Sequence, residues 1–287
     1  MKTISTELQT HLASECTTLA TCWKLTRKDS TTMGFSDHDQ DFTYDSVLYK
    51  AASGFNPSSL STNANMAVDT QDIEGLLSSA SITEEDILAG KYDSAEIEIF
   101  MVNYNDLTQG DIKLKKGWLG EVRLKNNQFI AEIRGLTQRL TQTIGELYSP
   151  SCRATLGDAR CGVNLANHQF ITTVTTVSDK QRFTCSALTQ DSADFTSGTV
   201  LFTSGNNNTL GMEIKEHIKL SSGGADITLT LPMPYVTTVG DNITVTRGCD
   251  KTLATCNTKF SNSINFRGEP HVPGLDKMFE TAGTRSE

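Results

Sequence analysis

The sequence of 287 residues has neither a long apolar segment nor an excess of positive charge. No run approaches the ~18 consecutive apolar residues of a membrane-spanning helix, so we expect no membrane-spanning segment. Lys and Arg number 25 against 34 Asp and Glu, which gives a formal net charge of −9. This balance argues against a protein that binds nucleic acid specifically through clustered cations, and against one that binds an anionic membrane surface.

The N-terminus also lacks the apolar core of a secretory signal. Residues 1–8 contain no apolar h-region, so we expect the chain to fold in a reducing cytoplasm. In that compartment, closely spaced cysteines are more often metal ligands or catalytic groups than disulfides.

Familiar catalytic motifs are missing as well. The sequence has no Gly-x-Ser-x-Gly elbow, no Walker loop and no His-Glu-x-x-His motif. The acidic segment at residues 37–41 fails the EF-hand template, because Phe42 stands at its glycine position and Leu48 at its bidentate acidic position. The five histidines are scattered without metal-ligand spacing. We therefore expect the chain not to be an enzyme.

Patterning in the first half predicts short helices and paired strands. An amphipathic helix over residues 5–18 would place Leu8, Leu12 and Cys16 on one face. A hairpin over residues 42–49 is expected to turn at Asp45-Ser46. The other expected elements are a strand at 22–26, a strand at 95–102, a hairpin of 118–124 with 128–133 across Asn126-Asn127, and a helix marked by Leu136, Leu140 and Ile144 that ends at Gly145.

A helix at residues 82–90 has clear start and stop signals. Thr83 is the expected N-cap and Asp86 the reciprocal capping residue. Ile82 and Ile87 would form a hydrophobic staple, and Gly90 would end the helix.

The second half reads as a small antiparallel β domain. Tyr148-Ser149-Pro150 breaks the preceding pattern, and turn signals then separate short strand-like segments, a rhythm typical of a barrel or sandwich. The expected strands are 169–177, 181–188, 198–203, 211–219, 225–231 and 242–247. We predict a mainly β (β-rich α+β) protein with a ring-forming β domain at 1–149, a β-barrel or sandwich domain at 150–279 and a flexible tail at 280–287.

Four of the seven cysteines form two close pairs, Cys152 with Cys161 and Cys249 with Cys256. Two sulfur pairs from distant loops can close one four-thiolate site that ties the domain together. Structural zinc sites favour ligands about two to four residues apart, whereas these pairs are separated by eight and six residues. An iron–sulfur cluster tolerates wider spacing because its ligands reach the corners of a cube. Free thiols, zinc and a cluster all remain open on spacing alone.

The residues around these cysteines favour a metal-bound state. Cations would offset the negative charge of four thiolates and lower their pKa, and glycines would let main-chain N–H groups approach sulfur. The same charges are also typical of ordinary solvated surface. Cys16, Cys22 and Cys185 lie in helix or strand patterns, so we expect them to pack in cores. The cations and glycines near the two cysteine pairs are Arg153, Arg160, Gly162, Arg247, Gly248 and Lys251.

Several segments together resemble one known family. They are CWKLTR (22–27), GFSDHD (34–39), YKAASGF (49–55), YSPSC (148–152), LGDARCGV (156–163), GCDK (248–251) and NFRGEPHVPG (265–274). These segments resemble the tail-tip hub proteins of gene transfer agents and many siphophages, including the upper hub protein of lambda-type tails. The two cysteine blocks are the most specific part of the resemblance. The chain departs from the family pattern at Arg153-Ala154-Thr155, where a more acidic stretch is usual, and at Asp45-Ser46, where Asp-Gly is usual.

The resemblance implies a structural protein of the virion tail tip, assembled in the bacterial host cytoplasm. It implies a homotrimeric baseplate hub ring that links the distal tail protein to the central tip or fibre (megatron-like) protein, with the tape measure protein as a further neighbour. DNA would pass through this ring without specific binding. The resemblance also implies a [4Fe–4S] cluster that stabilises the C-terminal domain, with zinc as the alternative. Its ligands would be Cys152, Cys161, Cys249 and Cys256.

Two other classes of function compete with this interpretation. The first is a tail-associated enzyme, either a redox protein or a cell-wall hydrolase, although the acidic residues are too dispersed to nominate a catalytic pair. The second is a carbohydrate-binding module, suggested by the Thr- and Asn-rich β half with Tyr235 and Trp118.

Overall fold

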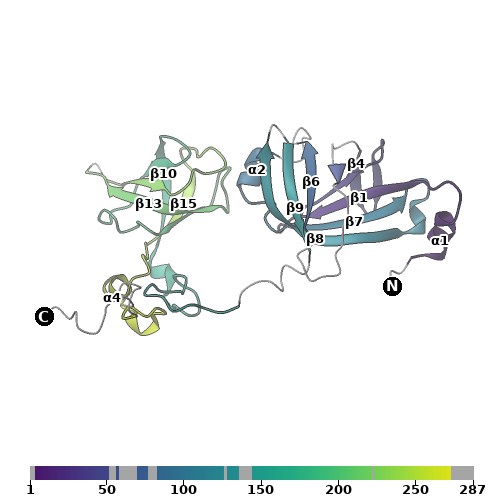
Figure 1. The fold of residues 1–287 in the computed structure, drawn as a ribbon. Coiled ribbons are helices and arrows are strands. Elements are labelled where there is room, and N and C mark those ends of the chain that lie inside the picture. Colours follow the sequence, from purple (N-terminus) through teal and green to yellow (C-terminus); the bar gives the residue numbers. More distant parts are fainter. Residues whose placement is uncertain are drawn as a thin grey trace. The chain divides into compact units, whose positions relative to one another are not determined.

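The structure is a computed structural model that describes residues 4–51, 56–57, 70–76, 83–125, 128–135, 144–221 and 223–272. The chain divides into two compact units, Met1–Thr143 and Ile144–Glu287, each of which is described by itself (Figure 1). In the described ranges, no helix is both long and apolar enough to cross a membrane.

The described part of unit 1 forms a nine-stranded sheet in the order β3-β4-β2-β1-β7-β8-β9-β6-β5. Its strand pairs are antiparallel except for β2 with β4, which run parallel. The strands are β1 (Leu19–Thr26), β2 (Thr32–Ser36), β3 (Phe42–Tyr44), β4 (Val47–Lys50), β5 (Asn56–Pro57), β6 (Thr70–Leu76), β7 (Glu96–Asn103), β8 (Asp111–Lys125) and β9 (Gln128–Arg134). The helical elements are α1 (Thr6–Leu12), α2 (Glu84–Leu88) and the 3-10 turn η1 (Leu107–Gln109).

The central strands of this sheet bury side chains on both faces. Successive residues of a strand point to opposite faces, so Trp23 of β1 and Ile99 of β7 join one apolar cluster. Cys22 and Phe100, their neighbours in sequence, join the other. Double-sided burial explains why the expected strand at 95–102 ends in a continuous apolar run.

The first predicted helix is too long. Within α1 only Leu8 is buried, Leu12 is 37% exposed, and Cys16 lies exposed beyond the helix end. The chain turns there because the Ser14 hydroxyl donates to the His11 carbonyl, which competes with further helix formation. The prediction that Cys16 packs in a core is therefore wrong.

Two other local predictions for unit 1 agree with the structure. Thr83 caps α2 by accepting the Asp86 N–H at 3.2 Å, and Gly90 follows the helix with φ of +68°. Asp45 and Ser46 turn the β3–β4 hairpin with φ of +47° and +61°, the left-handed pair that a two-residue turn needs. Ile144, in contrast, is exposed and outside any helix, so the prediction that it belongs to a helix ending at Gly145 is wrong. Ile82, Asn126, Asn127, Leu136 and Leu140 lie outside the described residues.

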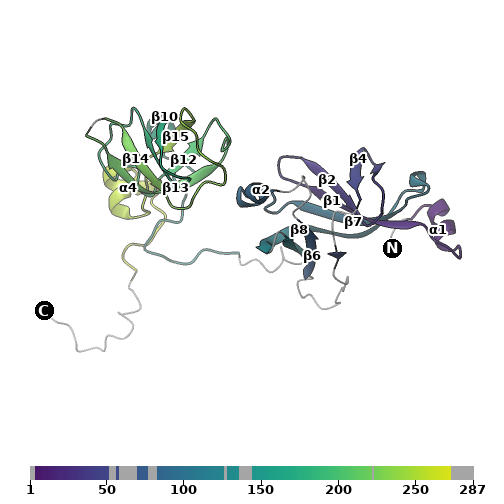
Figure 2. The same ribbon diagram turned by 90° about the horizontal axis from the view of Figure 1, so that it is seen from above.

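The described part of unit 2 contains a closed barrel in the order β10-β11-β14-β13-β12-β15, with β15 pairing back onto β10 (Figures 1 and 2). All six predicted strands are present, so the expected small antiparallel barrel is confirmed. They are β10 (Gln169–Val177), β11 (Arg182–Cys185), β12 (Thr199–Phe202), β13 (Gly211–Lys219), β14 (Ala225–Leu229) and β15 (Asn242–Thr246). Outside the barrel lie η2 (Leu165–Asn167), α4 (Leu253–Phe260) and η3 (Ser263–Asn265).

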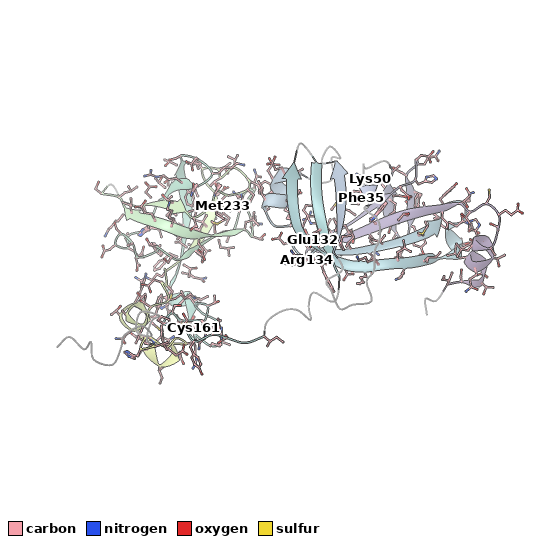
Figure 3. The ribbon with its side chains drawn as sticks, viewed as in Figure 1. Phe35, Lys50, Glu132, Arg134, Cys161 and Met233 are labelled. Atoms are coloured by element: carbon pink, nitrogen blue, oxygen red, sulfur yellow. The ribbon has the colours of Figure 1, made fainter. Side chains whose placement is uncertain are left out.

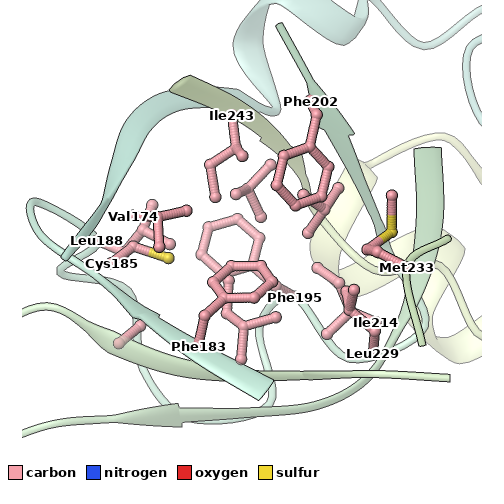
Figure 4. Packing of buried hydrophobic residues seen from close by; sticks show 14 residues of the cluster. Val174, Phe183, Cys185, Leu188, Phe195, Phe202, Ile214, Leu229, Met233 and Ile243 are labelled. Carbon is pink, nitrogen blue, oxygen red and sulfur yellow. The ribbon is translucent and has the colours of Figure 1, made fainter. Parts of the chain in front are cut away.

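Alternate strand residues and loop residues together fill the barrel. Phe183 and Phe202 point inward from β11 and β12, and Phe195 enters from the loop between these strands (Figure 4). Cys185 is buried among them, as predicted, and its burial raises the pKa of the thiol to about 12. Cys22 in unit 1 is likewise buried, and burial raises its pKa to about 12. Both thiols are therefore protonated core groups rather than ligands.

Candidate four-cysteine site

Barrel topology brings the two cysteine loops together. Gln169, the first residue of β10, pairs with Thr246, the last residue of β15. The Arg247 N–H then donates to the His168 carbonyl at 2.9 Å, which extends this pairing beyond the barrel. The loop that carries Cys152 and Cys161 therefore enters the barrel beside the point where the loop with Cys249 and Cys256 leaves it.

The four cysteines line one small cavity outside the barrel. Cys256 is buried, and Cys152, Cys161 and Cys249 are half-buried. Cys161 lies among the loops beside α4 (Figure 3). The cavity measures about 10 Å³, which is room for about one water molecule. The four cysteines thus border one common space.

A hydrogen-bonded turn shapes the first cysteine loop around Asp158. One carboxylate oxygen accepts the N–H groups of Arg160 and Cys161 at 2.9 and 2.7 Å, and the other accepts the Thr155 N–H at 2.8 Å. These bonds lower the pKa of the Asp158 carboxyl, with the Cys161 N–H as the largest cause. The ionised Asp158 carboxylate therefore fixes the position of Cys161 by binding the main-chain N–H of that residue.

The second cysteine loop approaches the barrel very closely at Gly248. A Cβ atom at this position would lie 1.7 Å from the Thr196 carbonyl oxygen, so only glycine fits. The Cys249 N–H donates to the Ser197 carbonyl at 3.2 Å directly afterwards. The Cys152 N–H in turn donates to the Lys251 carbonyl at 2.8 Å, which joins the two cysteine loops by their main chains.

Helix α4 carries the last cysteine. Thr252 caps it by accepting the Thr255 N–H at 3.2 Å, and the Cys256 thiol lies one turn further along. Burial raises the pKa of Cys256, and the sulfurs of the other three cysteines raise it further. That mutual influence is expected of four thiols gathered at one site.

Polar groups contact three of the four sulfurs. The main-chain N–H of Arg267 donates to the Cys152 sulfur at 3.4 Å, and the side-chain amide of Asn262 donates to the Cys161 sulfur at 3.7 Å. The Cys256 thiol donates to the Asn262 carbonyl at 3.3 Å. N–H donors of this kind stabilise negative charge on sulfur, so the donor set fits a thiolate-bound group.

The nearby arginines are engaged in ion pairs with carboxylates. Arg153 and Arg160 both pair with Glu146, the former at 3.0 Å. Arg247 pairs with Asp194 at 2.8 Å. Carboxylates thus already pair with these arginines, and the expectation that the arginines offset thiolate charge stays a prediction.

Lys251 lies at the cavity, whereas the N–H groups of Gly162 and Gly248 bond to main-chain oxygens and not to sulfur. Lys251 lines the cavity and its Nζ donates to the Ala154 carbonyl at 2.5 Å. The N–H groups of Gly162 and Gly248 donate to main-chain carbonyl oxygens at 2.8 and 3.1 Å. Sulfur is approached instead by Arg267 and Asn262, two residues that carry no ligand signature in the sequence.

Single-ion coordination is not preformed. Within the described ranges, no group of three or more His, Cys, Asp or Glu side chains is close enough to hold one metal ion. The acidic segment at 37–41 is a turn in which the Asp37 and Asp41 carboxylates accept main-chain N–H groups of Thr21 and Ala51, both at 2.7 Å. Two carboxylates of this segment, which does not fit the EF-hand template, thus bind main-chain N–H groups.

Comparisons with known proteins match two separate parts of the chain to family models. The family model described as "Baseplate hub protein, N-terminal attachment domain" matches residues 5–164. The model described as "Phage conserved hypothetical protein BR0599" matches residues 193–276. A chain in the solved structure "Virion of native gene transfer agent (GTA) particle" is 33% identical, with a TM-score of 0.82 over 98% of this chain and 97% of that one. No curated protein matches the chain. The chain therefore belongs to the baseplate hub protein family and is a structural component of the tail tip of a phage or gene-transfer-agent particle.

Proposed function

We propose that the chain is the subunit of a homotrimeric hub ring that links the distal tail protein to the central tip or fibre protein. The tape measure protein is a further candidate neighbour. A [4Fe–4S] cluster on Cys152, Cys161, Cys249 and Cys256 would stabilise unit 2 of each subunit. DNA would pass through the ring without specific binding, which a formal net charge of −9 favours.

One observation carries the proposal of a cluster. Cysteines from two loops nearly a hundred residues apart line one cavity, and N–H donors reach two of their sulfurs. When bound, the cluster would supply a covalent cross-link between the start and the end of unit 2. The chain itself provides the thiols, the donors and the main-chain bond from Cys152 to Lys251 that aligns the loops.

The spacing of the ligands favours a cluster over zinc. Structural zinc ligands are typically about two to four residues apart, whereas the cysteines of these two pairs are separated by eight and six residues. A cluster has its ligands further apart.

We further propose that the chain is not an enzyme. Support comes from the family, whose matched model describes a hub with an attachment domain. Peptidoglycan zymography tests the competing idea of a tail-associated hydrolase, and a cleared band from the purified chain would contradict a purely structural role. Binding of the chain to host polysaccharide in a glycan pull-down would instead favour the carbohydrate-binding alternative.

The first experiment is anaerobic purification followed by a visible spectrum and analysis of iron, sulfide and zinc in one sample. Brown protein with roughly four iron and four sulfide per chain is the expected result. Colourless protein with about one zinc would support the alternative ligand. Protein without either metal would contradict both versions of the site.

Assembly requires a separate measurement. Light scattering of the purified chain, alone and with the distal tail protein, is expected to give a mass of three copies in at least one of these states. Tails made without the chain should end at the distal tail protein and lack the central tip. A tail that retains its central tip without this chain would contradict the linking role.

A further inference from the structure

Asn262 contacts both cysteine pairs at once. This buried residue, 9% exposed, follows α4 directly. Its side-chain Nδ2 donates to the carbonyl oxygen of Cys161 at 2.6 Å and to the sulfur of Cys161 at 3.7 Å. Its main chain makes two hydrogen bonds with Cys256. The Asn262 carbonyl accepts from the Cys256 thiol at 3.3 Å, and the Asn262 N–H donates to the Cys256 carbonyl at 3.0 Å.

A second asparagine fixes the orientation of the Asn262 amide. Asn265 Nδ2 donates to Asn262 Oδ1 at 2.7 Å. Because Oδ1 is occupied as an acceptor, the Nδ2 end of the Asn262 amide faces Cys161. The helix ends at Ser261 in the left-handed conformation, with φ of +49°, which turns the chain so that Asn262 reaches back toward the cysteines.

We propose that Asn262 is a positioning residue of the four-thiolate site, setting the distance between Cys161 and Cys256 and donating an N–H to the Cys161 thiolate. This inference rests on the proposed cluster. It assigns a role to a residue that is not itself a ligand.

The contacts of Asn262 divide into those that survive deprotonation of the cysteines and those that do not. A thiolate has no proton to donate, so the bond from Cys256 to the Asn262 carbonyl is lost on binding. The bond from Asn262 Nδ2 to Cys161 strengthens, because a charged acceptor makes a stronger hydrogen bond. Asn262 therefore stabilises the more negative, reduced state of the site and slows loss of its metal.

The test uses three variants of the full chain. Asn262→Leu removes the donor without adding charge, and Asn262→Asp removes it and adds charge. Asn257→Asp is the matched control, since Asn257 is exposed on α4 and no side-chain hydrogen bond from it to a cysteine is present in the described structure. Each protein is analysed for iron and sulfide, midpoint reduction potential and rate of bleaching by a chelator.

Both Asn262 variants are expected to have a more negative midpoint potential and about 10-fold faster bleaching than wild type, and Asn257→Asp is expected to match wild type. A lower potential in Asn262→Asp alone would overturn the inference, because charge rather than the lost donor would then be the cause. Wild-type behaviour of both variants would overturn it as well.

Two further outcomes separate the hypotheses. If neither Asn262 variant holds iron, Asn265→Leu decides, because it frees the Asn262 amide to turn its oxygen toward Cys161. A wild-type potential in Asn265→Leu overturns the inference, and a more negative one supports it. Wild-type chain without iron and sulfide contradicts the proposed cluster itself.

Discussion

Arg153 and Glu269 form a bidentate ion pair within unit 2, with guanidinium-to-carboxylate distances of 2.6 and 2.8 Å. The pair joins the residue after Cys152 to residues 265–272, here called the C-terminal arm, which supplies the Arg267 N–H to the Cys152 sulfur. The Arg153 N–H also donates to the Arg267 carbonyl at 3.0 Å. The arm is thus attached directly after its contact with sulfur, at the Arg267 carbonyl and at Glu269.

Glu269→Gln should loosen this arm, because a neutral amide cannot replace a paired carboxylate on a guanidinium. Amide hydrogen exchange at Arg267 is expected to become several-fold faster. Asp191→Asn is the control: Asp191 pairs with Lys219 at 3.0 Å but is 96% exposed, and surface pairs of that kind contribute little. Unchanged exchange at Arg267 in Glu269→Gln would show that the main-chain bonds alone hold the arm.

Cys256→Ser should abolish the proposed cluster, because serine removes one of four thiolates. We expect less than about a tenth of wild-type iron, a lower melting temperature of unit 2, and particles that do not infect. Cys16→Ser, at an exposed thiol outside the site, should leave colour and melting unchanged. Wild-type iron in Cys256→Ser would remove this residue from the ligand set.

Gly248→Ala tests the close approach that positions Cys249. The new methyl group would lie 1.7 Å from the Thr196 oxygen, so we expect the loop to shift, with about 1–3 kcal/mol of lost stability and less bound iron. Gly211→Ala on β13 is the matched control, since its nearest atom would be the Val200 oxygen at 3.4 Å. Equal iron and stability in the two variants would mean that the second cysteine loop tolerates displacement.

His217 should make unit 2 less stable in mild acid. The ring is 2% exposed, it packs on Phe195 at 4.8 Å between centroids, and neither ring nitrogen has a hydrogen-bond partner within the described structure. Burial lowers its pKa; nearby Asp194 partly opposes this, and Lys259 lowers it further. The His217 ring therefore binds a proton less readily in the folded chain than in the unfolded chain.

Because the pKa of His217 is lowered in the folded chain, stability is lost as the pH falls below the ordinary pKa. Above the ordinary pKa of 6.5 neither state binds the proton, so the full stability is present. Below it the free energy of unfolding should fall by up to about 1.4 kcal/mol per pH unit. Urea unfolding of His217→Leu should have a shallower pH dependence, with the remainder due to His168, whose pKa burial also lowers. An unchanged slope in His217→Leu would contradict the prediction.

Strand positions in unit 2 could be predicted from sequence because its signals are local. The stretch from Gly211 to Lys219 has an outward-facing polar residue at most alternate positions, and turn residues bound it on both sides. Closure of the barrel is not local: it depends on pairing between β10 and β15, which lie far apart in the chain. The sequence therefore left barrel and sandwich open, and the structure decides for the barrel.

The cysteine pairs could be found by spacing and resemblance, whereas their supporting groups could not. Arg267 contributes a main-chain N–H, which every residue except proline possesses, so no side-chain pattern reveals it. Asn262 is one of many asparagines, and only the turn at Ser261 brings it to Cys161. The arginines near the cysteines suggested charge compensation, but two of their carboxylate partners, Glu269 and Asp194, lie far away in sequence and could not be foreseen.

Closure of the barrel affects how unit 2 can contact other chains in a tail tip. Each barrel strand that the structure describes has a hydrogen-bonded neighbour on both sides, so this unit offers no strand edge onto which another chain could add. Contacts of the barrel with other chains would consequently use its loops and outward-facing side chains. In the proposed ring, identical barrels could then lie next to one another without exchanging strands, and the ring would stay discrete rather than grow into a fibre.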